Sequence, residues 1–388
     1  MTATPDHPLV PAVQAALREV MDPELRRPIT DLGMVDAIAV GDDGDVSIRL
    51  LLTTGGCPLR QHLVGAVEAA VGAVAGVSQV NVEVGVMDDA QRAALRAHLG
   101  AGSRDIPFTR PDNLTRVIAV ASGKGGVGKS SITVNLACAL ARLGHKVGLL
   151  DADVYGHSVP DLMGIDPEDG PTQIPDLDMI VPVTAHDVAV ISIGMMKQAR
   201  EDVVAWRGPV VDRAIGQFLT DVSWGDLDFL LVDLPPGTGD VAIGFGQKLP
   251  NAEVIVVTTP QLAATEVAER AGTMAGILKQ KVIGVVENMS YLDAECPHCG
   301  KSHRVDLFGS GGGQAVAAHL SERLAYEVPL LAEVPLERDW RAAGDAGAPI
   351  VLLDSPSPAA AVLTELAERL SATRRKLTGF HLGLTPVS

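Results

Sequence analysis

A glycine-rich loop between an apolar strand and a helix constrains the fold of this chain more than any other feature. Residues 117–121 form an unbroken apolar run, residues 123–130 have the sequence GKGGVGKS, and residues 132–143 have helical spacing. This order fits the pattern G-x-x-x-x-G-K-[ST], in which backbone N–H groups surround phosphate oxygens. The N-terminus of the following helix adds partial positive charge at the same place. The loop therefore predicts a nucleotide-binding α/β domain.

The positions of this loop have separate expected roles. Lys129 is expected to contact the β- and γ-phosphates, and the Ser130 hydroxyl is expected to bind Mg²⁺. Lys124 is a second lysine in the same loop, although one lysine is enough for an ordinary phosphate loop. The other expected nucleotide contacts of the loop are Gly123, Gly125, Gly126, Val127, Gly128 and Ser131.

Short apolar runs alternate with helix-length segments after the loop, at 147–150, 188–193, 229–232, 254–258 and 282–286. Unbroken apolar strands are typical of a parallel sheet that is covered by helices on both faces. The sequence therefore predicts an α/β fold with a doubly wound, mostly parallel sheet, preceded by a small α+β domain.

Patterns of composition divide the chain into four segments. Residues 1–90 show helix, strand, strand, helix and strand patterns in that order, which predicts the small α+β domain. Residues 91–114 are expected to form a helix and a proline-containing linker. Residues 115–372 are expected to form the nucleotide-binding domain, and residues 373–388 a loose tail.

Aspartates follow two of the predicted strands. Asp153 is expected to orient an attacking water molecule, a positioning role typical of phosphoryl transfer. Asp233 begins DLPPGTGD after a second apolar strand and is expected near Mg²⁺. Asp151 and Asp240 are also expected near this ligand-binding edge of the sheet, and the alternative is that they only cap helices.

Composition excludes several protein classes. Asp and Glu total 48 and Lys and Arg total 31, so the net charge of −17 argues against a dedicated nucleic-acid binder. We find neither an apolar run of membrane-spanning length nor an export signal at the N-terminus, so no stable membrane association is expected. Four cysteines do not make a disulfide framework, and a cytoplasmic location is expected.

Six motifs together resemble the Mrp/ApbC family of P-loop ATPases, which carry and transfer iron–sulfur clusters. In order along residues 110–370 they are GKGGVGKS, DADVYGHSVP, WRGP, DLPPGTGD, ENMS and CPHCG. The offset of Lys124 resembles the deviant phosphate loop of the wider group that includes MinD, ParA and the nitrogenase iron protein. The resemblance implies that Lys124 acts on the nucleotide of a partner subunit and that Asn288 contacts the adenine base. His157 departs from the family, which usually has proline there.

Cys296 and Cys299 form a lone C-x-x-C pair with the sequence CPHC. Tetrahedral zinc and common iron–sulfur clusters usually need four protein ligands. Three solutions follow: two chains each donate a pair, His298 or His303 completes a zinc site, or the pair is a redox dithiol. The family resemblance implies the first solution, with a labile [4Fe–4S] cluster that bridges two subunits.

Cys57 stands in TTGGCP, between a predicted strand and a predicted helix. A helix N-terminus lowers the pKa of a thiol and favours a nucleophilic or metal-binding thiolate, which is one interpretation of Cys57. The alternative is that Cys57 has a structural role only. The first 90 residues, with DPEL, ITDLG and TTGGCP, resemble the small domain of SufT and PaaD-like proteins. This resemblance implies a link to iron–sulfur maturation.

The expected protein is therefore a slow, homodimeric ATPase that binds ATP, Mg²⁺ and an iron–sulfur cluster. Its expected partners are a cluster-assembly scaffold and apo iron–sulfur proteins. Three rivals remain: a MinD/ParA-type positioning ATPase, a scaffold for which ATP is a structural ligand, and a zinc-binding regulatory NTPase. The first rival needs a membrane helix or a basic DNA-binding face, and neither is evident in the sequence.

Overall fold

The computed structural model describes residues 2–3, 7–23, 25, 27–53, 60–99, 105–153, 156–174, 177–196, 208–296, 298–354 and 356–372. Cys57, Trp206 of WRGP and the expected tail lie outside the described residues. The chain forms two compact units. Unit 1 contains residues 1–103, 172–181 and 221–223, and unit 2 contains residues 104–171, 182–220 and 224–388.

Unit 1 is built on a four-stranded sheet in the order β1-β2-β3-β4. β2 and β3 form an antiparallel hairpin, whereas β3 and β4 are parallel and are connected through α2. Apolar residues alternate along β3 and recur at helical spacing in α1, so both elements bury one face in a common core. The elements are β1 (Thr2–Ala3), α1 (Val10–Arg18), β2 (Val35–Val40), β3 (Asp45–Leu52), α2 (Arg60–Gly72), β4 (Gln79–Val86) and α3 (Asp89–His98).

A hairpin from a distant part of the sequence also belongs to unit 1. It consists of β7 (Thr172–Ile174) and β8 (Met179–Val181), which pair in antiparallel fashion. Ile174, Leu177 and Met179 are buried in the hydrophobic cluster of this unit. The unit therefore extends beyond the expected segment 1–90, because long-range apolar burial leaves no local signal in the sequence.

Unit 2 contains an eight-stranded sheet in the order β16-β13-β12-β5-β11-β6-β10-β9. Every strand pair in it is parallel except β9 with β10, which confirms the predicted mostly parallel α/β fold. All seven residues of β5 are buried, as expected for a central strand covered on both faces. The strands are β5 (Arg116–Ser122), β6 (Val147–Asp151), β9 (Val183–Ala185), β10 (Val188–Ser192), β11 (Phe229–Asp233), β12 (Glu253–Thr258), β13 (Lys281–Asn288) and β16 (Leu330–Val334).

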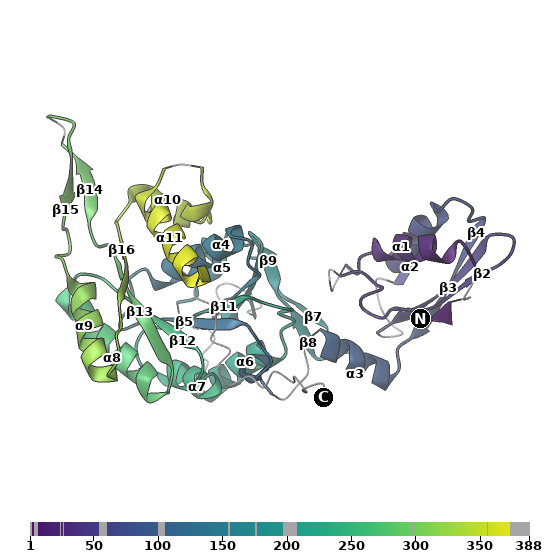
Figure 1. Ribbon diagram of the computed structural model, residues 1–388, viewed down its shortest axis with the longest axis horizontal. Coiled ribbons are helices and arrows are strands. Elements are labelled where there is room, and N and C mark those ends of the chain that lie inside the picture. Colours follow the sequence, from purple (N-terminus) through teal and green to yellow (C-terminus); the bar gives the residue numbers. More distant parts are fainter. Residues whose placement is uncertain are drawn as a thin grey trace, which may run out of the picture. The chain divides into compact units, whose positions relative to one another are not determined.

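Helices cover both faces of this sheet (Figure 1). α4, α5, α10 and α11 lie on one face, and α6, α7, α8 and α9 lie on the other. Their bounds are α4 (Lys129–Arg142), α5 (Val159–Leu162), α6 (Gly208–Thr220), α7 (Asp240–Lys248), α8 (Leu262–Ile277), α9 (Gly312–Leu324), α10 (Arg338–Asp345) and α11 (Pro358–Ala372); the short 3₁₀ turns are η1 (Pro107–Thr109), η3 (Ile193–Met196) and η4 (Ile350–Leu352).

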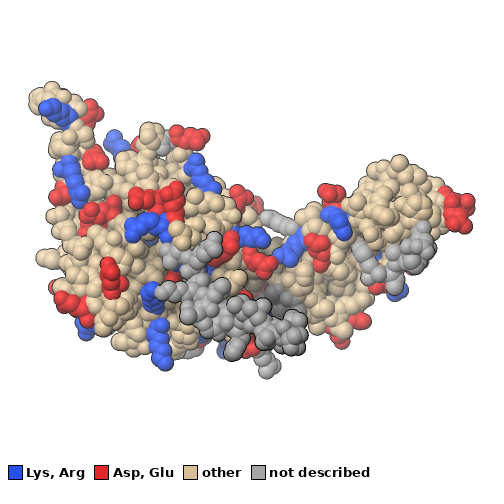
Figure 2. All heavy atoms as spheres, viewed as in Figure 1, with Lys and Arg blue, Asp and Glu red and all other residues tan. Residues whose placement is uncertain are grey.

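The carboxyl ends of the parallel strands meet at one edge of the sheet, where open α/β folds bind ligands. A second hairpin, β14 (Leu292–Glu295) with β15 (Ser302–Val305), follows β13 and projects from unit 2 (Figure 1). None of the helices in the described residues combines the length and apolar character that a bilayer crossing requires. Acidic and basic side chains are interspersed on the face shown in Figure 2.

Candidate functional site

The phosphate loop lies between β5 and α4, and its shape requires glycine at several positions. Gly126 and Gly128 have φ values of 82° and 78°, a region that strains residues with a side chain. A Cβ atom at Gly123 would lie 2.2 Å from the carbonyl carbon of Val267 in α8. The loop is therefore in close backbone contact with α8.

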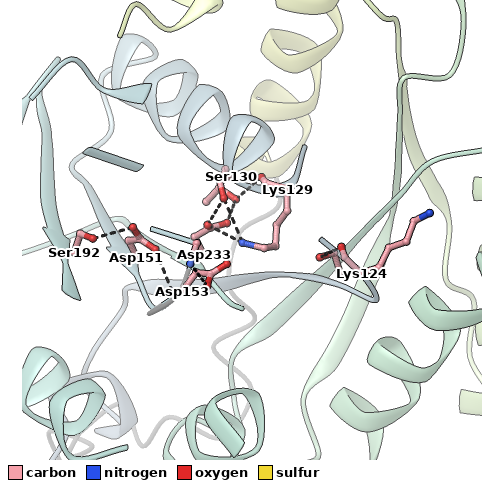
Figure 3. Close-up of polar contacts among 10 residues, drawn as sticks. Lys124, Lys129, Ser130, Asp151, Asp153, Ser192 and Asp233 are labelled. Carbon is pink, nitrogen blue, oxygen red and sulfur yellow. Dashed lines mark hydrogen bonds and ion pairs between the residues drawn. The ribbon is translucent and has the colours of Figure 1, made fainter. Parts of the chain in front are cut away.

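Asp233 lies at the centre of the polar contacts behind the loop (Figure 3). Its Oδ2 atom lies 2.7 Å from Nζ of Lys129 and accepts a 2.6 Å hydrogen bond from Ser130. Its Oδ1 atom lies 2.8 Å from the hydroxyl oxygen of Thr133. Sequence reasoning missed Thr133, although a hydroxyl one helical turn after Lys129 was a usable signal.

Asp151 is the last residue of β6, and Asp153 follows the strand, beside this group (Figure 3). Asp151 accepts hydrogen bonds from the Ser192 hydroxyl at 2.8 Å and from the backbone N–H of Asp153 at 3.1 Å, so it is not a helix cap. Burial and the negative charge of Asp233 raise the pKa of Asp151 to about 7, against the opposing effect of the Ser192 hydrogen bond. The Asp153 carboxylate accepts the N–H of Gly156 at 2.9 Å and lines the cavity next to the loop.

Two cavities adjoin the loop. The first has a volume of about 710 Å³ and is lined by the loop, by Asp153 and by the start of α7 at Asp240. The second has a volume of about 1180 Å³ and shares Gly128 and Ser131 with the first. The two cavities are therefore adjacent, with a smaller compartment at the loop and a larger one beside it.

Asn288, at the end of β13, lines the larger cavity and is only 3% exposed. Its Nδ2 atom donates a hydrogen bond of 2.9 Å to the carbonyl of Val127. Its Oδ1 atom is buried without a hydrogen-bond partner, and among the described side chains only Thr259 Oγ1 is in the same situation. A buried acceptor without a donor is costly, so this position fits a ligand that supplies an N–H group.

Lys124 is one of the residues that line the first cavity. Its side chain points away from Lys129 and Asp233 (Figure 3). Its Nζ atom donates a hydrogen bond of 3.2 Å to Oε1 of Gln261, which precedes α8. The ammonium group is therefore available outside the site formed by its own loop.

Cys296 and Cys299 lie at the tip of the β14–β15 hairpin. The backbone N–H of Cys296 donates to the carbonyl of Lys301, and Gly300, with φ of 65°, donates back to Cys296. Hydrogen bonds from the backbone N–H groups of His298 and Cys299, and from the Cys299 side chain, lower the pKa of Cys296. This turn therefore favours the thiolate form, which is the form that binds metals.

No group of three or more His, Cys, Asp or Glu side chains is arranged to hold a metal ion among the described residues. In this structure neither His298 nor His303 is grouped with the two cysteines in such an arrangement. Pro297 lies outside the described residues. The two thiols remain available for ligands from elsewhere.

Cys138 and His157 both have defined surroundings in the structure. Cys138 is buried in α4 beside Met163, and burial raises the pKa of its thiol to about 12, so it stays protonated. His157 lies directly against the backbone of Gly194, where an added Cβ would come within 2.7 Å of the ring. The departure at position 157 is thus accommodated by a glycine.

Comparison with known families gives two matches that together cover most of the chain. The family described as NUBPL iron-transfer P-loop NTPase matches residues 113–371. The family described as iron-sulfur cluster assembly protein matches residues 11–84.

Individual relatives carry consistent names. A protein of Mycobacterium tuberculosis (strain ATCC 25618 / H37Rv) named iron-sulfur cluster carrier protein is 52% identical over 388 residues, which is 100% of this chain and 99% of the relative. A protein of the same name from Synechocystis is 40% identical over 362 residues, covering 93% of this chain and 96% of the relative. A solved nucleotide-binding protein from Archaeoglobus fulgidus, in complex with ADP, is 36% identical with a TM-score of 0.52 and covers 64% of this chain and 92% of that one.

Proposed function

The chain belongs to the NUBPL iron-transfer P-loop NTPase family, and from this premise we propose that it binds and hydrolyses ATP and carries an iron–sulfur cluster to apo-proteins. The observation that carries the proposal is the occurrence, in one compact unit, of a phosphate loop and of a thiol pair in which Cys299 is exposed, Cys296 is partly exposed and the pKa of Cys296 is lowered. Neither a positioning ATPase nor a purely structural nucleotide site accounts for this thiol pair.

Adenine is the base that the larger cavity fits. The exocyclic amine of adenine would donate to the partnerless Oδ1 atom of Asn288. Guanine has a carbonyl oxygen at the corresponding position, and two acceptors facing each other in a buried site are unfavourable. The chain should therefore prefer ATP to GTP.

The residues behind the loop fit a magnesium ion. Ser130 and Asp233 provide hard oxygen atoms side by side, the ligand type that Mg²⁺ prefers. When bound, Mg²⁺ neutralises charge that develops on the phosphate oxygens. Lys129 then turns from Asp233 to the β- and γ-phosphates, and Asp153 orients the attacking water.

The cargo that we propose is a [4Fe–4S] cluster shared by two subunits. One chain brings two thiols to the hairpin tip, and a common cluster of this kind needs four. The described residues contain no group of three or more His, Cys, Asp or Glu side chains arranged to hold a metal, which fits a second chain as the source of the remaining ligands. Lys124 points away from its own phosphate site, which supports its action on the nucleotide of that second chain.

The proposed partners are a cluster-assembly scaffold and apo iron–sulfur proteins, and the proposed location is the cytoplasm, whose reducing conditions keep free thiols reduced. The match of residues 11–84 to an iron-sulfur cluster assembly family supports a role of unit 1 in the same process. Cys57 remains a candidate for cluster handling on the basis of its sequence context.

Anaerobic reconstitution with iron and sulfide tests this function. The wild-type chain should gain a brown chromophore, bind one cluster for two chains and sediment as a dimer. Cys296→Ala should abolish the chromophore, whereas the matched Cys138→Ala variant should retain it, because Cys138 is a buried core residue. Zinc bound at one ion per chain, with no chromophore, would reject the carrier function.

A further inference from the structure

The cavity that fits the base and the hairpin that carries the cysteines share one short segment of chain. β13 ends at Asn288 and β14 begins at Leu292. Asn288, Met289 and Leu292 all line the 1180 Å³ cavity. Cys296 follows only four residues after Leu292, so the cavity wall and the cysteine turn belong to one short stretch of chain.

This connecting segment is under conformational constraint. Met289 has a φ of 55°, a left-handed conformation that is uncommon for a residue with a side chain. The N–H of Ser290 donates to Val334 at 3.0 Å, and the carbonyl of Tyr291 accepts from Leu336 at 2.7 Å. Leu336 itself lines the cavity, so the segment is bonded to a second wall of the same compartment.

Arg304 joins the hairpin to this segment and to the edge of the main sheet. It lies on β15, and its guanidinium carbon is 4.0 Å from the centre of the Tyr291 ring. The same side chain approaches Glu333 of β16 at 3.7 Å and Asp306 at 3.2 Å. Three of the four residues of β15 are exposed, and Val305 is half-buried. The position of the hairpin therefore depends on contacts at its base.

We infer that Arg304 is a positioning residue that links occupancy of the base cavity to the orientation of the cysteine hairpin. A base that bonds Asn288 and fills the cavity acts on Met289, Leu292 and Leu336. Tyr291 lies between these residues, and the Arg304 guanidinium follows its ring. The hairpin therefore takes up different orientations with and without nucleotide, and the inference rests on the proposed function for its biological purpose.

Linkage makes this relationship reciprocal. If nucleotide changes the equilibrium for holding the cluster by a given factor, the cluster must change nucleotide affinity by the same factor. A cation–π contact at a partly exposed site corresponds to roughly a two- to fivefold change in an equilibrium. The effect of nucleotide on the hairpin should be of this size, and it should be lost when Arg304 is replaced by alanine.

Thiol reactivity of the cluster-free, full-length protein measures this coupling directly. Alkylation of Cys296 and Cys299 by iodoacetamide is followed by peptide mass spectrometry, with and without ADP or a non-hydrolysable ATP analogue. In the wild type, nucleotide should change the rate by roughly two- to fivefold, as the cation–π estimate implies. Arg304→Ala should react at one rate in both conditions, and Arg304→Lys should regain part of the difference. Lys301→Ala removes an exposed cation nearer the tip and should behave as the wild type.

A second pair of variants guards against a general loosening of the hairpin. Tyr291→Phe keeps the aromatic face and should keep the nucleotide effect, whereas Tyr291→Leu should lose it. The affinity for ATP, measured by titration, should differ roughly two- to fivefold between the wild type with the cluster and the wild type without it. In Arg304→Ala the two affinities should be equal. An unchanged nucleotide effect in Arg304→Ala, or equal rates in the wild type, would overturn the inference. A protein that fails to take up a cluster but shows Arg304-dependent thiol reactivity would reject the carrier function and support the inference.

Discussion

The Nζ atom of Lys129 lies 2.7 Å from Oδ2 of Asp233, and both side chains are buried. The lysine that is proposed to hold the phosphates is therefore paired with the carboxylate that is proposed to serve Mg²⁺. Removing one partner of a buried pair leaves an uncompensated charge, which is costly. In the proposed function, the phosphates replace Asp233 as the partner of Lys129, and Mg²⁺ replaces Lys129 as the partner of Asp233.

Thr133 should control how Asp233 is held. Its hydroxyl has one proton and two acceptors within reach, the Lys129 carbonyl at 2.9 Å and Asp233 at 2.8 Å, and the charged acceptor makes the stronger bond. Thr133→Val should lower the free energy of unfolding by about 1.5–3 kcal/mol, the range for a hydrogen bond to a charged group. Urea denaturation of the nucleotide-free protein measures this, with Thr133→Ser as the control that keeps the hydroxyl. Equal stability of the valine and serine variants would contradict the assignment.

Asp151 should make stability depend on pH. Its pKa is raised from 3.8 to about 7 in the folded protein, so the folded state binds more protons than the unfolded state between these values. The free energy of unfolding of the metal-free, nucleotide-free wild type, measured relative to Asp151→Asn, should therefore fall as pH rises from about 4 to about 7. Above that window the difference should become constant. Parallel stability curves for the two proteins across the window would show that Asp151 is not perturbed.

Lys124 should act in trans. Lys124→Ala and Lys129→Ala should each be inactive as ATPases when assayed alone. A mixed dimer contains one site with Lys129 from one chain and Lys124 from the other, so an equimolar mixture should recover roughly a quarter of the wild-type rate by random pairing. Gln261→Ala, which removes the intrachain partner of Lys124, should remain active. A mixture without any recovery would indicate that Lys124 acts within its own chain.

Asn288 should set both affinity and base preference. Asn288→Ala removes the buried acceptor and should raise the Kd for ATP by roughly two- to tenfold, the range for one hydrogen bond. The ratio of the Kd values for GTP and ATP should fall in the same variant. Thr259→Val removes the other buried partnerless oxygen and should leave nucleotide affinity unchanged. Isothermal titration with both nucleotides distinguishes a base contact from a general loss of binding.

Much of the nucleotide-binding unit could be predicted because its signals are local. The phosphate loop, the apolar strands and the aspartates that follow them are all encoded in short windows of sequence. The same local reasoning gave no account of Thr133, since its importance depends on Asp233, which lies 100 positions away in sequence. The Tyr291–Arg304 contact depends in the same way on the pairing of two strands.

The hydrogen bonds at Cys296 illustrate a further limit. The sequence CPHC indicates two nearby thiols, but the backbone N–H groups that lower the Cys296 pKa depend on the turn that the hairpin forms. Likewise, Lys124 was identified by its offset in the loop, whereas its direction away from Lys129 is a property of the folded loop.

The β7–β8 hairpin has a practical consequence for dissecting this protein. Because residues 172–181 and 221–223 belong to unit 1, the chain passes between the units five times. A fragment that starts at residue 104 would keep Ile174, Leu177 and Met179 and discard most of the apolar side chains around them. In such a fragment the β7–β8 hairpin would expose these apolar side chains to water and favour aggregation. An isolated ATPase unit therefore requires that the hairpin be removed or that these residues be replaced by polar ones.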